Sequence, residues 1–145
     1  MPDQPILESL RVTSLLAGRL LERELAARGV PAEQFALVDE IGRAEPVTPS
    51  ELARRTGQPP TTLSDHLNRL SRRGLVRRER NPVDGRSRLI TLTDAGSSLR
   101  AAGSPAVERA EALVAAQLRT PVHDVDRALA HLEFAARSAL DHPNP

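Results

Sequence analysis

The chain has 145 residues, a formal net charge of +1, no cysteine and 1% aromatic residues. This length suits one domain with helical extensions, and the absence of cysteine excludes disulfides, cysteine zinc sites, iron–sulfur clusters and thiol nucleophiles. No apolar run approaches the roughly 18 residues of a membrane span, and the N-terminal residues lack the pattern of a secretory signal. We therefore expect a cytoplasmic protein without a membrane partner.

The small net charge conceals one strongly basic segment. All basic residues are arginines, and residues 54–88 hold ten of them against three acidic residues, a balance of +7. The rest of the chain has ten arginines and sixteen acidic residues, a balance of −6. This segregation is typical of a protein that meets a polyanion with one region, although a solvated arginine-rich surface has the same composition.

Apolar spacing predicts two helices in the N-terminal part of the chain. The first covers residues 6–28 and carries more than one apolar stripe, so two of its faces should be covered. Gly29 ends it, and Pro31 prevents its continuation. The second covers residues 32–43, with Phe35 among the residues turned inward.

Two short helices are predicted next. Thr48 opens a capping box with proline at the first helical position, which predicts a helix over residues 49–56. Gly57 supplies a turn, and a second helix with one stripe of leucines then runs to about residue 73. Gly74 is placed to end this helix at its C′ position.

Beyond that glycine the apolar period changes from helix to strand. Residues 75–80 and 88–92 are two short strand-like runs, and turn-forming residues at 81–87 join them into a hairpin with a basic tip.

Two longer helices are predicted after the hairpin. Thr93 and Asp94 cap the first, over about residues 95–118, and Gly103-Ser104-Pro105 should bend or interrupt it because proline removes a backbone hydrogen bond. Thr120-Pro121 opens the last helix, whose apolar residues form a narrow seam suited to packing against another helix. That seam consists of Val122, Val125, Leu129, Leu132, Ala136 and Leu140.

A short helix, a turn, a second helix and a basic hairpin are the layout of a winged helix-turn-helix. We therefore predict a mainly helical fold with a small β-hairpin wing. Asn68 on the second helix can pair with adenine, and Arg86 at the hairpin tip can enter a minor groove. The predicted DNA-binding residues are Thr61, Thr62, Ser64, Asp65, Asn68, Arg69, Arg72, Arg86 and Arg88.

Residues 48–96 resemble the DNA-binding core of the MarR family of bacterial transcriptional regulators. The hairpin carries the most specific part of the resemblance, NPVDGRS followed by LITLTDAG. In the family the wing aspartate orients the loop, and the arginine two residues later probes the minor groove. The resemblance assigns these roles to Asp84 and Arg86.

The flanking helices also follow the order of the family. The resemblance implies one domain over residues 1–145, with a winged helix-turn-helix core at 32–96. Helices from two subunits would interlock through residues 5–29 and 97–141, and the two-fold symmetry then predicts a pseudo-palindromic site with half-sites about 34 Å apart. An intrachain helical bundle would instead cover the same apolar faces without a partner.

The chain departs from the family pattern at the start of the second helix. It has Pro59-Pro60 where members often have serine, Asp65 where many have arginine, and His66 where many have an aliphatic residue. Asp65 can accept a hydrogen bond from cytosine N4, or it can pair with Arg69 one helical turn later. The operator sequence therefore cannot be taken from relatives.

Other kinds of site find little support. The chain has no glycine-rich phosphate loop and no nucleophile elbow, so we expect neither an enzyme nor a cofactor. Four residues near the last helix could suggest a metal site, but no three of them share a face well, and no metal is predicted. These are His123, Asp124, Asp126 and His131.

Many relatives release DNA when they bind a small, often aromatic effector. We name no effector site, because Phe35 and Phe134 are the only aromatic residues and both are expected in the core. The predicted function is a homodimeric, sequence-specific DNA-binding repressor with double-stranded DNA and itself as partners, and the resemblance implies, as a further partner, a small-molecule effector that releases it. A protein-interaction module and a non-specific architectural DNA binder are the alternatives that use the same fold.

Overall fold

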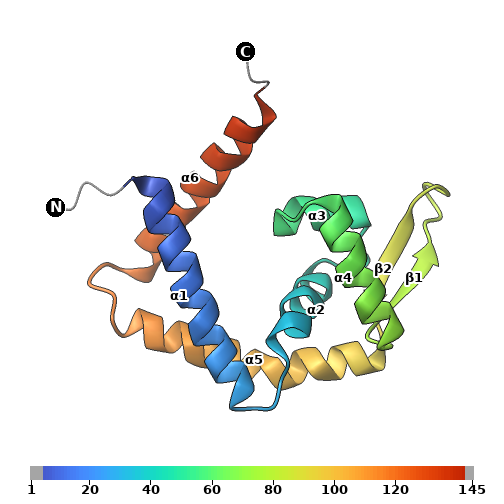
Figure 1. The fold of residues 1–145 in the computed structure, drawn as a ribbon, viewed down its shortest axis with the longest axis horizontal. Helices are drawn as coiled ribbons and strands as arrows, with labels where there is room; N and C mark the ends of the chain where they lie inside the picture. Colours follow the sequence, from blue (N-terminus) through green and yellow to red (C-terminus); the bar gives the residue numbers. More distant parts are fainter. Residues whose placement is uncertain (1–4, 143–145) are drawn as a thin grey trace. The chain divides into compact units, whose positions relative to one another are not determined.

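The structure, a computed structural model, describes residues 5–142. Six helices and a two-stranded antiparallel sheet make up this part of the chain, which confirms the predicted fold class (Figure 1). In chain order they are α1 (Ile6–Ala26), α2 (Ala32–Ala44), α3 (Pro49–Thr56), α4 (Pro60–Arg72), β1 (Val76–Arg80), β2 (Arg88–Leu92), α5 (Asp94–Ala115) and α6 (Val122–Asp141). The chain divides into two compact units after Ala110.

The first unit is built on two clusters of buried apolar residues. The larger cluster joins α2, α3, α4 and the hairpin, and the smaller joins α1, α2 and α5. The larger consists of Leu37, Val38, Ile41, Val47, Leu52, Leu63, Leu67, Leu70, Leu75, Val76, Ile90 and Leu92. The smaller consists of Leu25, Val30, Phe35 and Ala106. Full burial of one such side chain is worth roughly 1.5–3 kcal/mol, so these clusters fix the positions of α3, α4 and the hairpin.

Local residues set the ends of the short helices. The Thr48 hydroxyl accepts a hydrogen bond from the Glu51 N–H at 3.2 Å, with Pro49 at the first helical position, as predicted. Gly57 and Gly74 follow α3 and α4 with φ of 68° and 69°, the left-handed conformation in which a side chain is strained. Each of the two helices therefore ends because a glycine follows it closely in the sequence.

The hairpin pairs Val76 with Leu92 at its base and Arg80 with Arg88 near its tip. A segment before α3 adds to this sheet, because Val47 forms a bridge with Ile90. This contact was not predicted, since an isolated bridge has no strand-like run of its own. It anchors the wing to the chain that leads into α3.

The Thr93 hydroxyl joins three parts of the first unit. It donates to the Gly74 carbonyl at 2.6 Å and accepts from the Gly96 N–H at 3.1 Å, which caps α5 as predicted. A Cβ at Gly96 would lie 2.1 Å from the Leu75 carbonyl oxygen. The start of α5 therefore packs directly against the backbone that follows α4.

Helix α5 continues without interruption through Pro105, which corrects the prediction of a break. Gly103 has a different role: a Cβ there would lie 2.1 Å from the Phe35 ring, so this glycine makes room for a buried aromatic side chain. The Ser104 hydroxyl bonds the Arg100 carbonyl at 2.9 Å and stays within the helix. Gly103 is thus explained by packing against Phe35 of α2, and it does not mark a turn.

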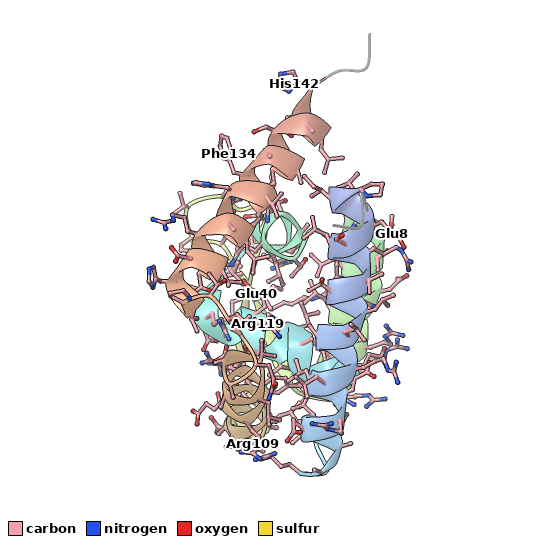
Figure 2. All side chains as sticks on the ribbon, turned by 90° about the vertical axis from the view of Figure 1, so that its left-hand side faces the viewer. Glu8, Glu40, Arg109, Arg119, Phe134 and His142 are labelled. Carbon is pink, nitrogen blue, oxygen red and sulfur yellow. The ribbon has the colours of Figure 1, made fainter. Side chains whose placement is uncertain are left out.

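The second unit contains the end of α5 and all of α6. No residue of α6 is buried, and Phe134 is 73% exposed, so the expectation that Phe134 belongs to the core is wrong (Figure 2). The predicted seam of α6 is at most half-buried. Its apolar residues have no core within their own unit.

Helix α1 also presents apolar side chains outside the core. Leu15 and Leu16 are 57% and 58% exposed. Near its start, the Arg11 guanidinium bonds the Glu8 carboxylate at 2.5 Å and holds the pKa of that carboxyl below its ordinary value. Among residues 5–142, no helix combines the length and apolar character needed to span a membrane.

Candidate nucleic-acid interface

Helix α4 turns one face to the core and the rest to solvent. Leu63, Leu67 and Leu70 are buried. All nine predicted DNA-binding residues and the wing aspartate Asp84 are exposed. Seven of the nine lie on α4, and Arg86 and Arg88 lie on the wing.

The N-terminus of α4 leaves backbone donors available. Pro59 precedes the helix and makes no side-chain cap, and Pro60 has no N–H to satisfy. The first intrahelical bond runs from the Leu63 N–H to the Pro59 carbonyl at 3.0 Å. The N–H groups of Thr61 and Thr62 precede that bond and point along the helix axis, an arrangement that suits a phosphate oxygen.

The wing tip is held in shape by its own polar groups. The Asp84 carboxylate accepts a hydrogen bond from the Arg86 N–H at 3.1 Å, and Asn81 Nδ2 donates to Ser87 Oγ at 2.8 Å. Within residues 5–142, the Arg86 guanidinium makes no ion pair or hydrogen bond. The loop is thus fixed while the arginine at its tip is left exposed.

Two polar contacts restrain side chains on the outer face of α4. Arg69 Nη2 lies 3.0 Å from a carboxylate oxygen of Glu33 on α2, and Arg78 Nη2 of β1 donates to Asn68 Oδ1 at 2.8 Å. Asp65 is exposed and makes no ion pair within the described chain, so Arg69 pairs with Glu33 and not with Asp65. Sequence reasoning missed Glu33 and Arg78, because neither lies near its partner in the chain.

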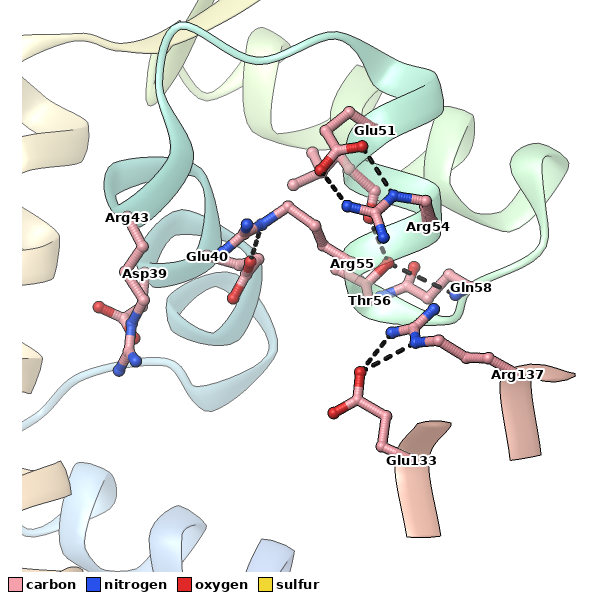
Figure 3. A network of polar contacts seen from close by, with 11 residues as sticks. Asp39, Glu40, Arg43, Glu51, Arg54, Arg55, Thr56, Gln58, Glu133 and Arg137 are labelled. Atoms are coloured by element: carbon pink, nitrogen blue, oxygen red, sulfur yellow. Dashed lines mark hydrogen bonds and ion pairs between the residues drawn. The ribbon is translucent and has the colours of Figure 1, made fainter. Parts of the chain in front are cut away.

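The arginines of α3 contribute less free charge than their number suggests. Arg55 Nε lies 2.5 Å from a carboxylate oxygen of Glu40, and Arg54 Nη2 lies 2.6 Å from one of Glu51 (Figure 3). Both acidic partners lie outside the basic segment 54–88. The excess positive charge of the segment therefore lies mainly on the wing, because on α4 Arg69 is paired with Glu33 and Asp65 offsets Arg72.

A cavity of about 300 Å³ lies between α3, α4 and the hairpin, and Arg78 and Arg88 line its basic side.

In the first turn of α6, the His123 ring lies 3.4 Å from the Asp124 carboxylate. In the part of the chain that the structure describes, no three His, Asp or Glu side chains are arranged to hold a metal ion.

Residues 28–87 match a model of the MarR family. The HTH-type transcriptional regulator YdgJ of Bacillus subtilis is 30% identical over 71 residues, and the transcriptional regulator HosA of Escherichia coli is 35% identical over 72 residues. These matches span about half of this chain, 43% of YdgJ and 53% of HosA.

Solved structures match over nearly the whole chain. The transcriptional regulator MosR of M. tuberculosis is 30% identical with a TM-score of 0.77, and the comparison covers 94% of this chain and 98% of that one. MosR in complex with DNA gives a TM-score of 0.79 at 29% identity, covering the same shares of the two chains. The sequence similarity and the shared winged fold lead to one conclusion: the chain belongs to the MarR family of transcriptional regulators, which are not enzymes.

Proposed function

We propose that this protein is a homodimeric, sequence-specific DNA-binding repressor that places α4 in a major groove and the wing in the adjacent minor groove. The observation that carries the proposal is the exposed face shared by α4 and the wing. This face combines free N–H groups, small hydroxyl side chains and arginines without acidic partners. These groups bind phosphates and base edges.

The arginines support different parts of this contact. Arg72 and Arg88 are exposed and form no ion pair among residues 5–142, so both are available to phosphate oxygens. Arg86 is presented by a loop that Asp84 holds in shape, which suits insertion into the negative potential of a minor groove. That MosR has been solved with DNA in a similar fold adds to this support.

The apolar faces of α1 and α6 support dimerisation. Each helix exposes large hydrophobic side chains that its own unit leaves uncovered, and such surfaces mark protein interfaces. On α1 these are Ile6, Leu7, Val12, Leu15 and Leu16, and on α6 they are Val122, Leu129, Phe134 and Leu140. A symmetric dimer would present two winged units to a pseudo-palindromic site.

We further propose that a small-molecule effector releases the protein from DNA. Its support is the cavity of about 300 Å³ between α3, α4 and the hairpin, whose size suits a small molecule. A bound effector should raise the melting temperature of the free protein and weaken its affinity for DNA. Small aromatic acids are the first probes to use, because two arginines line the cavity.

Fluorescence anisotropy with two labelled duplexes tests DNA recognition. One duplex carries the DNA upstream of the gene for this chain, and the other has the same length and base composition in scrambled order. We expect the upstream duplex to bind at least about 10³-fold more tightly. Equal affinities would indicate an architectural DNA binder, and no binding at low salt would indicate a protein-interaction module.

A further inference from the structure

We infer that Arg78 is a specificity-determining residue that makes Asn68 read guanine in place of adenine. The inference rests on the proposed DNA-binding function and adds to it the base that one side chain of α4 recognises. Arg78 acts as a positioning residue, because it orients the Asn68 amide from the neighbouring strand.

The contact between the two side chains fixes the orientation of the amide. Arg78 Nη2 lies 2.8 Å from Asn68 Oδ1. A guanidinium group has only donors, so the amide atom that faces it has to be the oxygen. The amide NH₂ group of Asn68 therefore points away from Arg78.

The hairpin geometry explains why Arg78, and not its neighbour, reaches α4. Arg78 pairs with Ile90 and shares its face of the hairpin with Val76, which is buried in the core with Ile90. Arg77 lies on the opposite face, where its Nε bonds Thr91 Oγ1 at 3.1 Å. Arg78 has no acidic partner within residues 5–142, so the Asn68 amide is its hydrogen-bond partner there.

Adenine and guanine require different atoms of an asparagine amide to face the base. Adenine presents an acceptor at N7 and a donor at N6, so bidentate pairing needs the amide oxygen and the amide NH₂ group to face the base together. Guanine presents acceptors at both N7 and O6. An amide whose oxygen is held by Arg78 offers the groove its donors, which suits guanine.

Asp65 adds a hydrogen-bond acceptor beside the Asn68 amide donor on the same face of α4. It lies three residues before Asn68, within one helical turn, and is exposed. A carboxylate only accepts hydrogen bonds, and cytosine N4 is a donor in the major groove. An acceptor and an oriented donor side by side therefore favour G·C pairs at the positions that these two residues contact.

Selection from a library of duplexes with randomised palindromic half-sites, followed by sequencing, tests this inference on the full chain. The Asn68→Ala variant identifies the position that Asn68 reads, because the base preference there should disappear. At that position we expect the wild type to favour guanine over adenine by about tenfold. In Arg78→Ala, adenine should become at least as frequent as guanine.

Two further variants separate orientation from charge and folding. Arg77→Ala removes the same charge from the same strand and should keep the guanine preference. Arg78→Lys retains a donor-only cation and should restore most of the preference lost in Arg78→Ala. Circular dichroism melting curves show whether each variant is folded.

The outcomes distinguish this inference from the proposed function. Preference for adenine in the wild type, an unchanged profile in Arg78→Ala, or an unchanged profile in Asn68→Ala would each overturn the role of Arg78 while leaving sequence-specific binding intact. Failure of the wild type to enrich any duplex would overturn the proposed function and this inference with it.

Discussion

The winged part of the chain and its flanking helices use apolar residues in opposite ways. In the winged part, leucines, valines and isoleucines from α2, α3, α4 and the hairpin are buried together in one cluster. On α6 no residue is buried, and α1 leaves several leucines exposed along its first half. The winged part buries its large apolar side chains within its own cluster, whereas α1 and α6 leave large apolar side chains uncovered, and the proposed dimer would cover them.

The difference shows that apolar content alone does not locate a core. Leu52 and Leu16 are both leucines within helices, yet the first is 0% and the second 58% exposed. What separates them is the presence of other elements within reach. Substitutions in the two regions should therefore affect different properties: stability in the first and assembly in the second.

The largest expected effect is on the core of the winged part. Leu52→Ala removes a fully buried side chain from α3 and should lower the free energy of unfolding by about 3 kcal/mol, because the cavity left behind collapses only partly. Denaturant unfolding followed by circular dichroism measures this change. Val83→Ala at the 94% exposed wing tip is the control and should change stability by less than about 0.5 kcal/mol. A loss below about 1 kcal/mol in Leu52→Ala would contradict the core described above.

The matching change in the flanking helices should act on assembly. Leu16→Asp places a charge on the exposed apolar face of α1 and should weaken the dimer at least about 100-fold, or about 2.7 kcal/mol. Sedimentation velocity over a range of protein concentrations reports the dissociation constant. Val83→Asp introduces the same charge outside these helices and should leave it unchanged. A wild type that sediments as a monomer at every concentration would refute the proposed dimer.

Two glycines of the flanking helices, one packed against Phe35 of α2 and one without a neighbour, give a test with a smaller expected effect. Gly103→Ala should cost about 2 kcal/mol of stability, because the added Cβ would lie 2.1 Å from the Phe35 ring. Gly18 of α1 has no atom within 4 Å of the same position, and Gly18→Ala should leave stability unchanged or raise it by up to about 1 kcal/mol. Thermal unfolding compares the two variants. Equal effects would mean that Gly103 is not a packing residue.

The smallest effect is expected at the wing. Arg86→Ala should reduce affinity for DNA about fivefold, near 1 kcal/mol, and lower the slope of log affinity against log salt by about 1, with the fold intact. Anisotropy titrations at several salt concentrations give both quantities. Arg109 is exposed on α5 outside the basic segment, and Arg109→Ala should change neither (Figure 2). Unchanged binding by Arg86→Ala would remove the wing from the interface.

Features encoded by neighbouring residues were predictable from the sequence. The Thr48 cap, the glycine after α4 and the turn-rich NPVDGRS segment each act within a few positions. Their geometry follows from local hydrogen bonding and backbone sterics. The order of elements, and with it the winged fold, therefore follows from signals that neighbouring residues carry.

Features that depend on distant residues were not predictable in this way. Gly103 and Pro105 resemble a helix break, but the Phe35 ring from α2 occupies the space beside that glycine. Phe134 resembles a core residue, but its own unit offers nothing to cover it. A periodicity argument uses a short window of sequence, so it detects neither the Phe35 ring beside Gly103 nor the lack of covering residues around Phe134.

The candidate interface shows the same limit. The exposure of the predicted α4 and wing residues follows from the leucine stripe that points the other way. The partners of those residues do not follow, because Asn68 meets Arg78 across ten positions and Arg69 pairs with Glu33 on another helix. A spacing rule for one helix allowed Asp65 as the partner of Arg69, and tertiary packing supplied Glu33 instead.

The Thr93 hydroxyl has a mechanical consequence. It bonds the carbonyl at the end of α4 and the N–H in the first turn of α5, and its residue directly follows β2. A tilt of α5 at this end would therefore be transmitted to the segment after α4 and to β2 through this hydroxyl and through the contact of Gly96 with the Leu75 carbonyl. In the proposed complex, α4 and the wing should then move together, so that an adjustment of the half-site spacing displaces both and preserves the angle between them.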